Sequence, residues 1–135
     1  MSTTRRHTGS CLCGGVRYER SAEPGPIEVC YWQMCRKASG GPLATNAQLA
    51  SADLHLSAGA ELLAEYESSP GERRFFCRTC GSPIYSQRAA RPDVVRIRVG
   101  TINEDLTVRP AASYYTGFKC NWWEIHDSLP RFETE

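Results

Sequence analysis

The sequence predicts a mainly β fold, organised as a small single domain with several short strands and one short helix. Apolar side chains alternate with polar ones in several short runs, a period typical of strands that bury one face. Turn-forming residues separate these runs. The chain of 135 residues has the length of about one domain, and its sequence contains no repeat, low-complexity segment or linker.

Each expected element rests on a local pattern. Alternation predicts strands at 16–19, 53–57, 62–67 and 95–99, and apolar side chains also predict strands at 27–29 and 73–77. The sequence Ser-Ser-Pro-Gly-Glu at 68–72 is typical of a turn, so the strands on either side of it are expected to form a hairpin. The one convincing helical stretch, 33–39, is short and is ended by Gly-Gly-Pro.

The charge balance excludes some classes of partner. The chain carries 16 basic and 15 acidic residues, a net charge of +1, whereas nucleic-acid and anionic-lipid surfaces need clustered, uncompensated basic residues. No apolar stretch approaches the ~20 residues of a membrane helix. The polar segment 1–8 is not followed by the apolar core of a signal peptide. We therefore expect a cytoplasmic protein with neither nucleic acid nor membrane as a partner.

Seven cysteines are a high count for such a chain. They are too sparse for a disulfide scaffold, and their number is odd. In a reducing compartment, closely spaced cysteines are more often metal ligands or catalytic thiols. The question is which of the seven belong together.

Two pairs of cysteines lie on short turns that are each followed by glycine. Cys11 and Cys13 form the first pair, and Cys77 and Cys80 form the second. Zinc favours four thiolates in a tetrahedron, and a glycine after each pair permits a tight turn around the ion. The alternatives are four buried thiols or a disulfide within the second pair. We expect one structural zinc ion, which makes the predicted domain a zinc-stabilised β fold.

A second group of cysteines has weaker support. Cys35 is expected near the start of the short helix beside Arg36 and Lys37, where the thiolate is favoured and becomes nucleophilic or metal-binding. Cys30 is its partner, but two thiolates do not complete a catalytic zinc site. The remaining candidates for a third ligand are Cys120, His126, His55 and His7. The structural alternative is that Cys30 and Cys35 are both core residues.

Other chemistry-bearing residues have mainly structural interpretations. Four aromatic side chains either wall a small-molecule pocket or fill the core or a dimer contact, and we expect packing. They are Tyr31, Trp32, Trp122 and Trp123. The basic pair at 73–74 is expected on a solvated strand face and not in a site for an anionic substrate.

Several stretches together resemble the glutathione-dependent formaldehyde-activating enzyme family, also called the GFA or CENP-V domain. They are the cysteine stretches 9–19, 35–40 and 76–85, with 99–102 and 129–132. The resemblance covers about residues 8–132 as one zinc-binding domain, with the stretches in the family's order.

The resemblance implies a β-rich fold shared with a Rab-binding chaperone and with methionine sulfoxide reductase B. It implies a structural zinc on the two glycine-trailed cysteine pairs. It also implies, for the enzymes of the family, a second, catalytic zinc on a Cys-x-Cys-x-x-Cys motif. These enzymes are described as carbon–sulfur lyases that make or break a glutathione–formaldehyde adduct.

The sequence departs from the family at this catalytic motif. Its outer cysteines match Cys30 and Cys35, but its middle position is Trp32, and an indole cannot bind zinc. Two functions therefore remain. The first is a carbon–sulfur lyase acting on glutathione or other thiol adducts of aldehydes, with Cys30 and Cys35 in the catalytic site. Without a metal, Cys35 could exchange with thiol adducts directly, and Cys30 could resolve the product of that exchange. The second is a non-catalytic, zinc-stabilised binding module.

Overall fold

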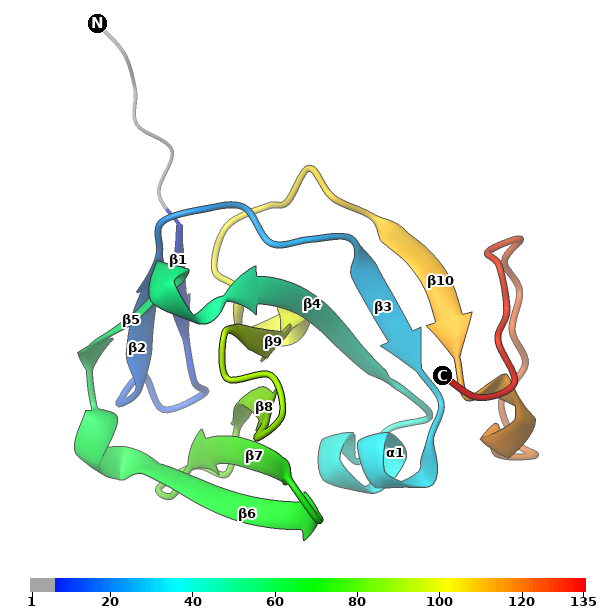
Figure 1. The fold of residues 1–135 in the computed structure, drawn as a ribbon, viewed down its shortest axis with the longest axis horizontal. Helices are drawn as coiled ribbons and strands as arrows, with labels where there is room; N and C mark the ends of the chain where they lie inside the picture. The colour runs from blue at the N-terminus through cyan, green and yellow to red at the C-terminus, as the bar shows by residue number, and fades with distance from the viewer. Residues whose placement is uncertain (1–6) are drawn as a thin grey trace, which may run out of the picture.

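The computed structural model describes residues 7–135, and within them ten strands form two sheets (Figure 1). The small sheet contains, in spatial order, β1 (Thr8–Ser10), β2 (Arg17–Arg20) and β5 (Leu54–Ala58). The large sheet contains, in spatial order, β10 (Pro110–Tyr114), β3 (Ile27–Cys30), β4 (Ala44–Ala50), β9 (Val94–Arg98), β8 (Pro83–Arg88), β7 (Glu72–Cys77) and β6 (Leu63–Ser69). All pairings are antiparallel except that of β10 with β3, which is parallel.

The single α-helix of the described residues, α1 (Gln33–Ser39), follows β3 directly. Gly40 ends it in the left-handed conformation (φ 76°), and its N–H donates to the carbonyl of Arg36 at 2.8 Å. Cys35 is the buried residue of this helix. Figure 1 shows the large sheet curling so that α1 lies between its two ends. Four short 3₁₀ turns complete the elements: η1 (Ser51–Asp53), η2 (Ala60–Leu62), η3 (Val99–Thr101) and η4 (Thr116–Phe118).

The main core lies between the small sheet and the middle of the large one. Its buried members are Cys11, Val16, Tyr18, Leu49, Cys77, Ile84, Val95 and Ile97. Tyr18 is 1% exposed, and its hydroxyl forms a 2.8 Å hydrogen bond with the hydroxyl of Thr101. The two cysteines in this cluster join the core to the metal-type site described below.

The predicted fold class is confirmed: the protein is a small, mainly β domain with one short α-helix. The predicted hairpin is formed by β6 and β7, which pair antiparallel around the turn at Pro70 and Gly71. Alternation did not reveal β1, β4, β8 or β10. No helix in residues 7–135 is long and apolar enough to cross a membrane.

Candidate functional site

The four cysteines on the two glycine-trailed turns lie together. Their sulfur atoms are all within 4.8 Å of one another, with 3.6 Å between Cys11 and Cys13 and 3.8 Å between Cys13 and Cys77. Cys80 completes the group. The first turn precedes β2, and Cys77 is the last residue of β7. Four sulfur atoms at these separations could hold one metal ion.

Backbone N–H groups point at the sulfur atoms of the first turn. Val16 N–H donates to Cys11 Sγ at 3.2 Å, and Gly15 N–H donates to Cys13 Sγ at 3.4 Å. On the second turn, the hydrogen bond between Cys80 Sγ and the Ser82 hydroxyl (3.3 Å), followed by the backbone N–H groups of Cys13 and Ser82, lowers the pKa of Cys80 to about 5. The pKa values of Cys11 and Cys80 are lowered, which favours the thiolate form in which cysteine binds metals. The N–H of Gly15 lowers the pKa of Cys13, but the neighbouring sulfur atoms, that of Cys11 first, raise this pKa to about 11.

Cys30 and Cys35 form a separate pair. The thiol of Cys30 donates to Cys35 Sγ at 2.8 Å, and the two side chains are only 7% and 6% exposed. Cys30 is the last residue of β3, and Cys35 lies in the first turn of α1. The strand end and the helix start therefore bring these sulfur atoms into direct contact.

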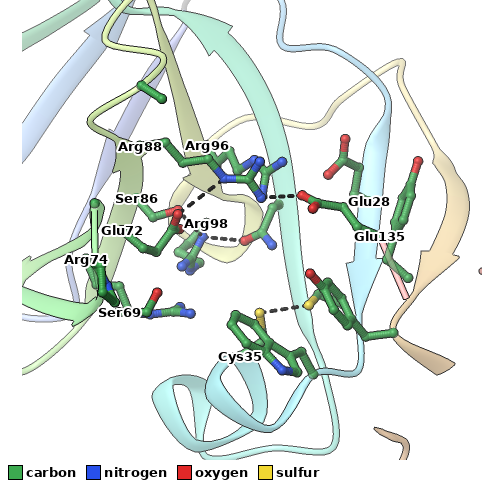
Figure 2. Close-up of a pocket in the computed structure, with 18 residues that line it drawn as sticks. Glu28, Cys35, Ser69, Glu72, Arg74, Ser86, Arg88, Arg96, Arg98 and Glu135 are labelled. Carbon is green, nitrogen blue, oxygen red and sulfur yellow. Dashed lines mark hydrogen bonds and ion pairs between the residues drawn. The ribbon is translucent and has the colours of Figure 1, made fainter. Parts of the chain in front are cut away.

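The pair lies at the wall of a cavity of about 500 Å³, a volume suited to a small-molecule ligand. Four arginines line this cavity: Arg74, Arg88, Arg96 and Arg98. Figure 2 shows the thiol of Cys35 facing the space beneath the arginines, with Glu28 and Glu135 across from them.

Strand register explains why the arginines gather on one face. Arg74 on β7 is opposite Ser86 on β8, which is in turn opposite Arg96 on β9. Arg98 is two residues further along β9 and donates to the side chain of Asn46, its partner on β4. Directly opposed residues, and residues two apart, share a face of a sheet.

The arginines differ in their partners. Arg88 forms ion pairs with Glu72 and Glu135. Arg74, Arg96 and Arg98 form no ion pair with a carboxylate of the described residues. Burial lowers the pKa of Arg98 to about 10, so it remains charged at neutral pH. Arg74 and Arg98 do donate to neutral side chains, to Ser68 and to Asn46 respectively. The cavity therefore presents three arginines whose charge is not paired with a carboxylate of the described residues.

The hydrogen bond from Cys30, followed by the positive charges of Arg74 and Arg98, lowers the pKa of Cys35 to about 6. The same contact and burial raise the pKa of Cys30. At neutral pH the pair therefore holds one proton, and Cys35 is the thiolate. The direction of the pKa shift of Cys35 agrees with the expected thiolate, but the arginines that contribute to it lie on β7 and β9 and not beside Cys35 on α1.

Two other expectations are corrected. Arg74 does not belong to a solvated strand face, since it lines the cavity; only its neighbour Arg73 is exposed. The aromatic residues do not share one role: Tyr31 is buried in the core, while Trp122 and Trp123 are 62% and 39% exposed.

Trp32 lines the cavity, so packing does not describe it fully. It stacks on Tyr115 with ring centroids 5.1 Å apart. Tyr115 adopts a left-handed backbone (φ 57°), a conformation that costs about 1–2 kcal/mol for a residue with a side chain. The stack and the strained backbone fix one wall of the cavity.

The candidate third ligands do not approach the Cys30–Cys35 pair. Within residues 7–135, the four-cysteine cluster is the one group of three or more cysteine, histidine or acidic side chains placed to share a metal ion. The candidates Cys120, His126, His55 and His7 do not line the cavity. The sequence had not indicated Arg88, Arg96, Arg98 or Tyr115 as site residues; the Arg-x-Arg spacing of 96–98, which places both on one strand face, was the available signal.

These features define a class of protein: a small β domain with a four-cysteine metal-type cluster and a separate, arginine-lined cavity that contains a thiol pair. The family model for the glutathione-dependent formaldehyde-activating enzyme matches residues 6–117. The chain belongs to this GFA family.

Two known proteins illustrate the relationship. A relative from Halomonas elongata, whose name provisionally describes it as a glutathione-dependent formaldehyde-activating enzyme, is 37% identical over 110 residues, which are 76% of this chain and 69% of the relative. The crystal structure of a Rhodobacter sphaeroides protein, a structural-genomics target, superimposes with a TM-score of 0.63 at 27% identity. That similarity covers 77% of this chain and 99% of the other.

Proposed function

We propose that the protein binds a thiol adduct of an aldehyde, of the glutathione–formaldehyde type, in the arginine-lined cavity and makes or breaks its carbon–sulfur bond there. The observation that carries this proposal is the hydrogen-bonded thiol pair of Cys30 and Cys35 at the wall of a cavity with three arginines that form no ion pair with a carboxylate of residues 7–135. The lowered pKa of Cys35 makes it the thiolate of the pair. Family membership and the name of the Halomonas relative support the choice of glutathione.

The charges of the cavity suit glutathione. This tripeptide has two carboxylates, one ammonium group and one thiol, and arginine binds carboxylates through paired, charge-assisted hydrogen bonds. Of Arg74, Arg96 and Arg98, two can hold the carboxylates while the third stabilises a thiolate. Glu28, on the opposite wall, is placed for the ammonium group.

The reaction is an addition with no change in oxidation state. The sulfur of the carrier thiol bonds to the aldehyde carbon, its S–H bond breaks, and the carbonyl oxygen gains a proton. Cys35 accepts the thiol proton as a general base, and the pair it forms with Cys30 returns a proton to the oxygen. Cleavage of the adduct follows the same path in reverse.

We propose further that the four-cysteine cluster holds a structural zinc ion. Zinc–sulfur bonds of about 2.3 Å in a tetrahedron place the sulfur atoms about 3.8 Å apart, which agrees with the observed 3.6 and 3.8 Å. The ligands would be Cys11, Cys13, Cys77 and Cys80. The ion would link the first turn of the chain to the end of β7, and it has no part in the reaction above.

The Cys30–Cys35 pair does not fit the second zinc that the family resemblance implies. Its sulfur atoms are 2.8 Å apart, well below the tetrahedral separation, and no third ligand of the described residues lies with them. This misfit favours the second candidate, a binding module that takes up the same thiol without converting it.

Isotope-exchange NMR distinguishes the two candidates by measuring how fast formaldehyde interconverts with its glutathione adduct. We expect wild type to accelerate the exchange and Cys35→Ser to reduce the acceleration at least about 100-fold, the lower end of the contribution of a general acid–base group. Cys120→Ser is the matched control, because Cys120 is equally buried but does not line the cavity. A wild-type rate equal to that of buffer would refute the lyase, and glutathione binding without acceleration would establish the module.

A further inference from the structure

We propose that Cys30 and Cys35 also form a redox-active dithiol that reduces disulfides of the glutathione class and ends as a Cys30–Cys35 disulfide. This second activity rests on the glutathione-type ligand of the proposed function, but not on its carbon–sulfur reaction.

The distance between the two sulfur atoms supports this proposal most directly. They are 2.8 Å apart, and a disulfide bond needs about 2.05 Å. Cys30 is fixed by strand pairing with Ala44 on one side and Tyr114 on the other, whereas Cys35 sits on a two-turn helix. Closing the bond therefore needs a sub-ångström movement of sulfur and no rearrangement of the sheet.

The surroundings assign a different role to each thiol. Cys35 accepts the hydrogen bond of Cys30 and lies in the field of Arg74 and Arg98, so it carries the negative charge and attacks. Cys30 donates its S–H to Cys35 and is held beside it, as a resolving thiol must be.

The exchange balances in two steps. The Cys35 thiolate attacks one sulfur of the glutathione disulfide, forms a mixed disulfide and releases one glutathione thiolate. The thiol of Cys30 then gives up its proton and attacks Cys35 Sγ, which releases the second glutathione. The protein dithiol loses two electrons, the substrate disulfide gains them, and the proton of Cys30 goes to the departing thiolate.

The charge of the cavity suits such a substrate. Each glutathionyl group carries two carboxylates, and the three arginines that form no ion pair within residues 7–135 line the same cavity as Cys35. The other thiols of the chain lack this arrangement. The cluster cysteines are grouped as metal ligands, and Cys120 does not line the cavity.

The test treats the reduced, metal-loaded full chain with glutathione disulfide, quenches it with an alkylating agent and maps the cysteines by mass spectrometry. We expect wild type to form the Cys30–Cys35 disulfide and release two glutathiones per chain. We expect Cys30→Ser to keep one glutathionyl group on Cys35, and Cys35→Ser to leave Cys30 unmodified. Unchanged metal content and circular dichroism verify that each variant is folded.

Several results would overturn the proposal. They are a stable glutathionyl adduct in wild type, no label on Cys35 in the Cys30→Ser chain, and a disulfide between other cysteines. Bis(2-hydroxyethyl) disulfide, which has no carboxylates, should react at least about tenfold more slowly, because even one charge-assisted hydrogen bond contributes about 1.5 kcal/mol or more. Equal rates for this disulfide and for glutathione disulfide would refute the preference for substrates of the glutathione class.

The adduct assay is run under full reduction, so the two functions fail independently. A chain that forms the disulfide but leaves the adduct unconverted refutes the lyase alone. A chain that converts the adduct but forms no disulfide refutes this inference alone.

Discussion

Replacing Cys30 with alanine removes the hydrogen-bond donor to Cys35 and leaves the positive charges of Arg74 and Arg98 in place. The S–H group of Cys30 is the largest cause of the lowered pKa of Cys35, ahead of Arg74 and Arg98. A hydrogen bond to a charged group contributes about 1.5–3 kcal/mol, and about 1.4 kcal/mol corresponds to one pKa unit. The variant should therefore raise the pKa of Cys35 from about 6 to between about 7 and 8.

The assay is the rate of alkylation of Cys35 by iodoacetamide as a function of pH, followed by peptide mapping so that the cluster thiols are counted separately. Wild type should reach half its maximal rate near pH 6, and Cys30→Ala one to two pH units higher. Identical profiles would show that the arginines alone set the pKa and would refute the role given to the hydrogen bond.

Unfolding free energies provide a second readout of the same interaction. The pKa of Cys35 is lower in the folded chain than its ordinary value of 9.0, so its ionisation stabilises the fold fully above about pH 9. This contribution is lost as the pH falls towards about 6. Stability should therefore rise across this window, by up to about 4 kcal/mol in wild type and by less in Cys30→Ala. A steeper rise in the variant would contradict the argument.

Three further outcomes follow from the fold and the cavity. Cys77→Ser should lose the bound metal, measured by elemental analysis, and a large part of its stability, because a structural zinc contributes on the order of 10 kcal/mol; full metal occupancy would contradict the four-thiolate site. Arg74→Gln should weaken glutathione binding about 10-fold or more in calorimetry, whereas Arg73→Gln on the same strand should not; equal losses would place the ligand elsewhere. Gly59→Ala should lower the free energy of unfolding by about 2–5 kcal/mol in a denaturant melt, because the backbone of Gly59 is left-handed and a Cβ would lie 2.0 Å from the Gly15 carbonyl oxygen. Gly100→Ala is the control, since a Cβ at Gly100 meets nothing within 4 Å, and equal losses in both variants would contradict this reason.

Most of the strands that the sequence predicted show alternation of apolar and polar residues. Tyr18 on β2 is buried while its neighbours Arg17 and Glu19 are exposed, so alternation is visible in the residue types. In β4 it is not, because Ala44, Asn46 and Ala47 in its first half are all buried, so burial alternates only in its second half. A segment buried on both faces and built from small and polar residues has no readable period.

The site also contains residues that the sequence predicted and residues that it did not. Cysteines two or three positions apart on a glycine-trailed turn are a local pattern, so the four-cysteine group could be read from the chain. The positions of Arg74, Arg96 and Arg98 depend on which strands pair and in which register. Register is a long-range property that single-sequence patterns do not encode, and for this reason Arg74 was assigned to solvent.

The metal-type cluster joins two turns that are far apart in the chain, since Cys13 and Cys77 are separated by 64 positions. During synthesis at about 5–20 residues per second, the second turn is made on the order of 3–13 s after the first. Until then, the first two thiols have no partners with which to enclose an ion. The proposed metal site can therefore form only after more than half of the polypeptide has been synthesised, and its first two thiols have to stay reduced during this interval.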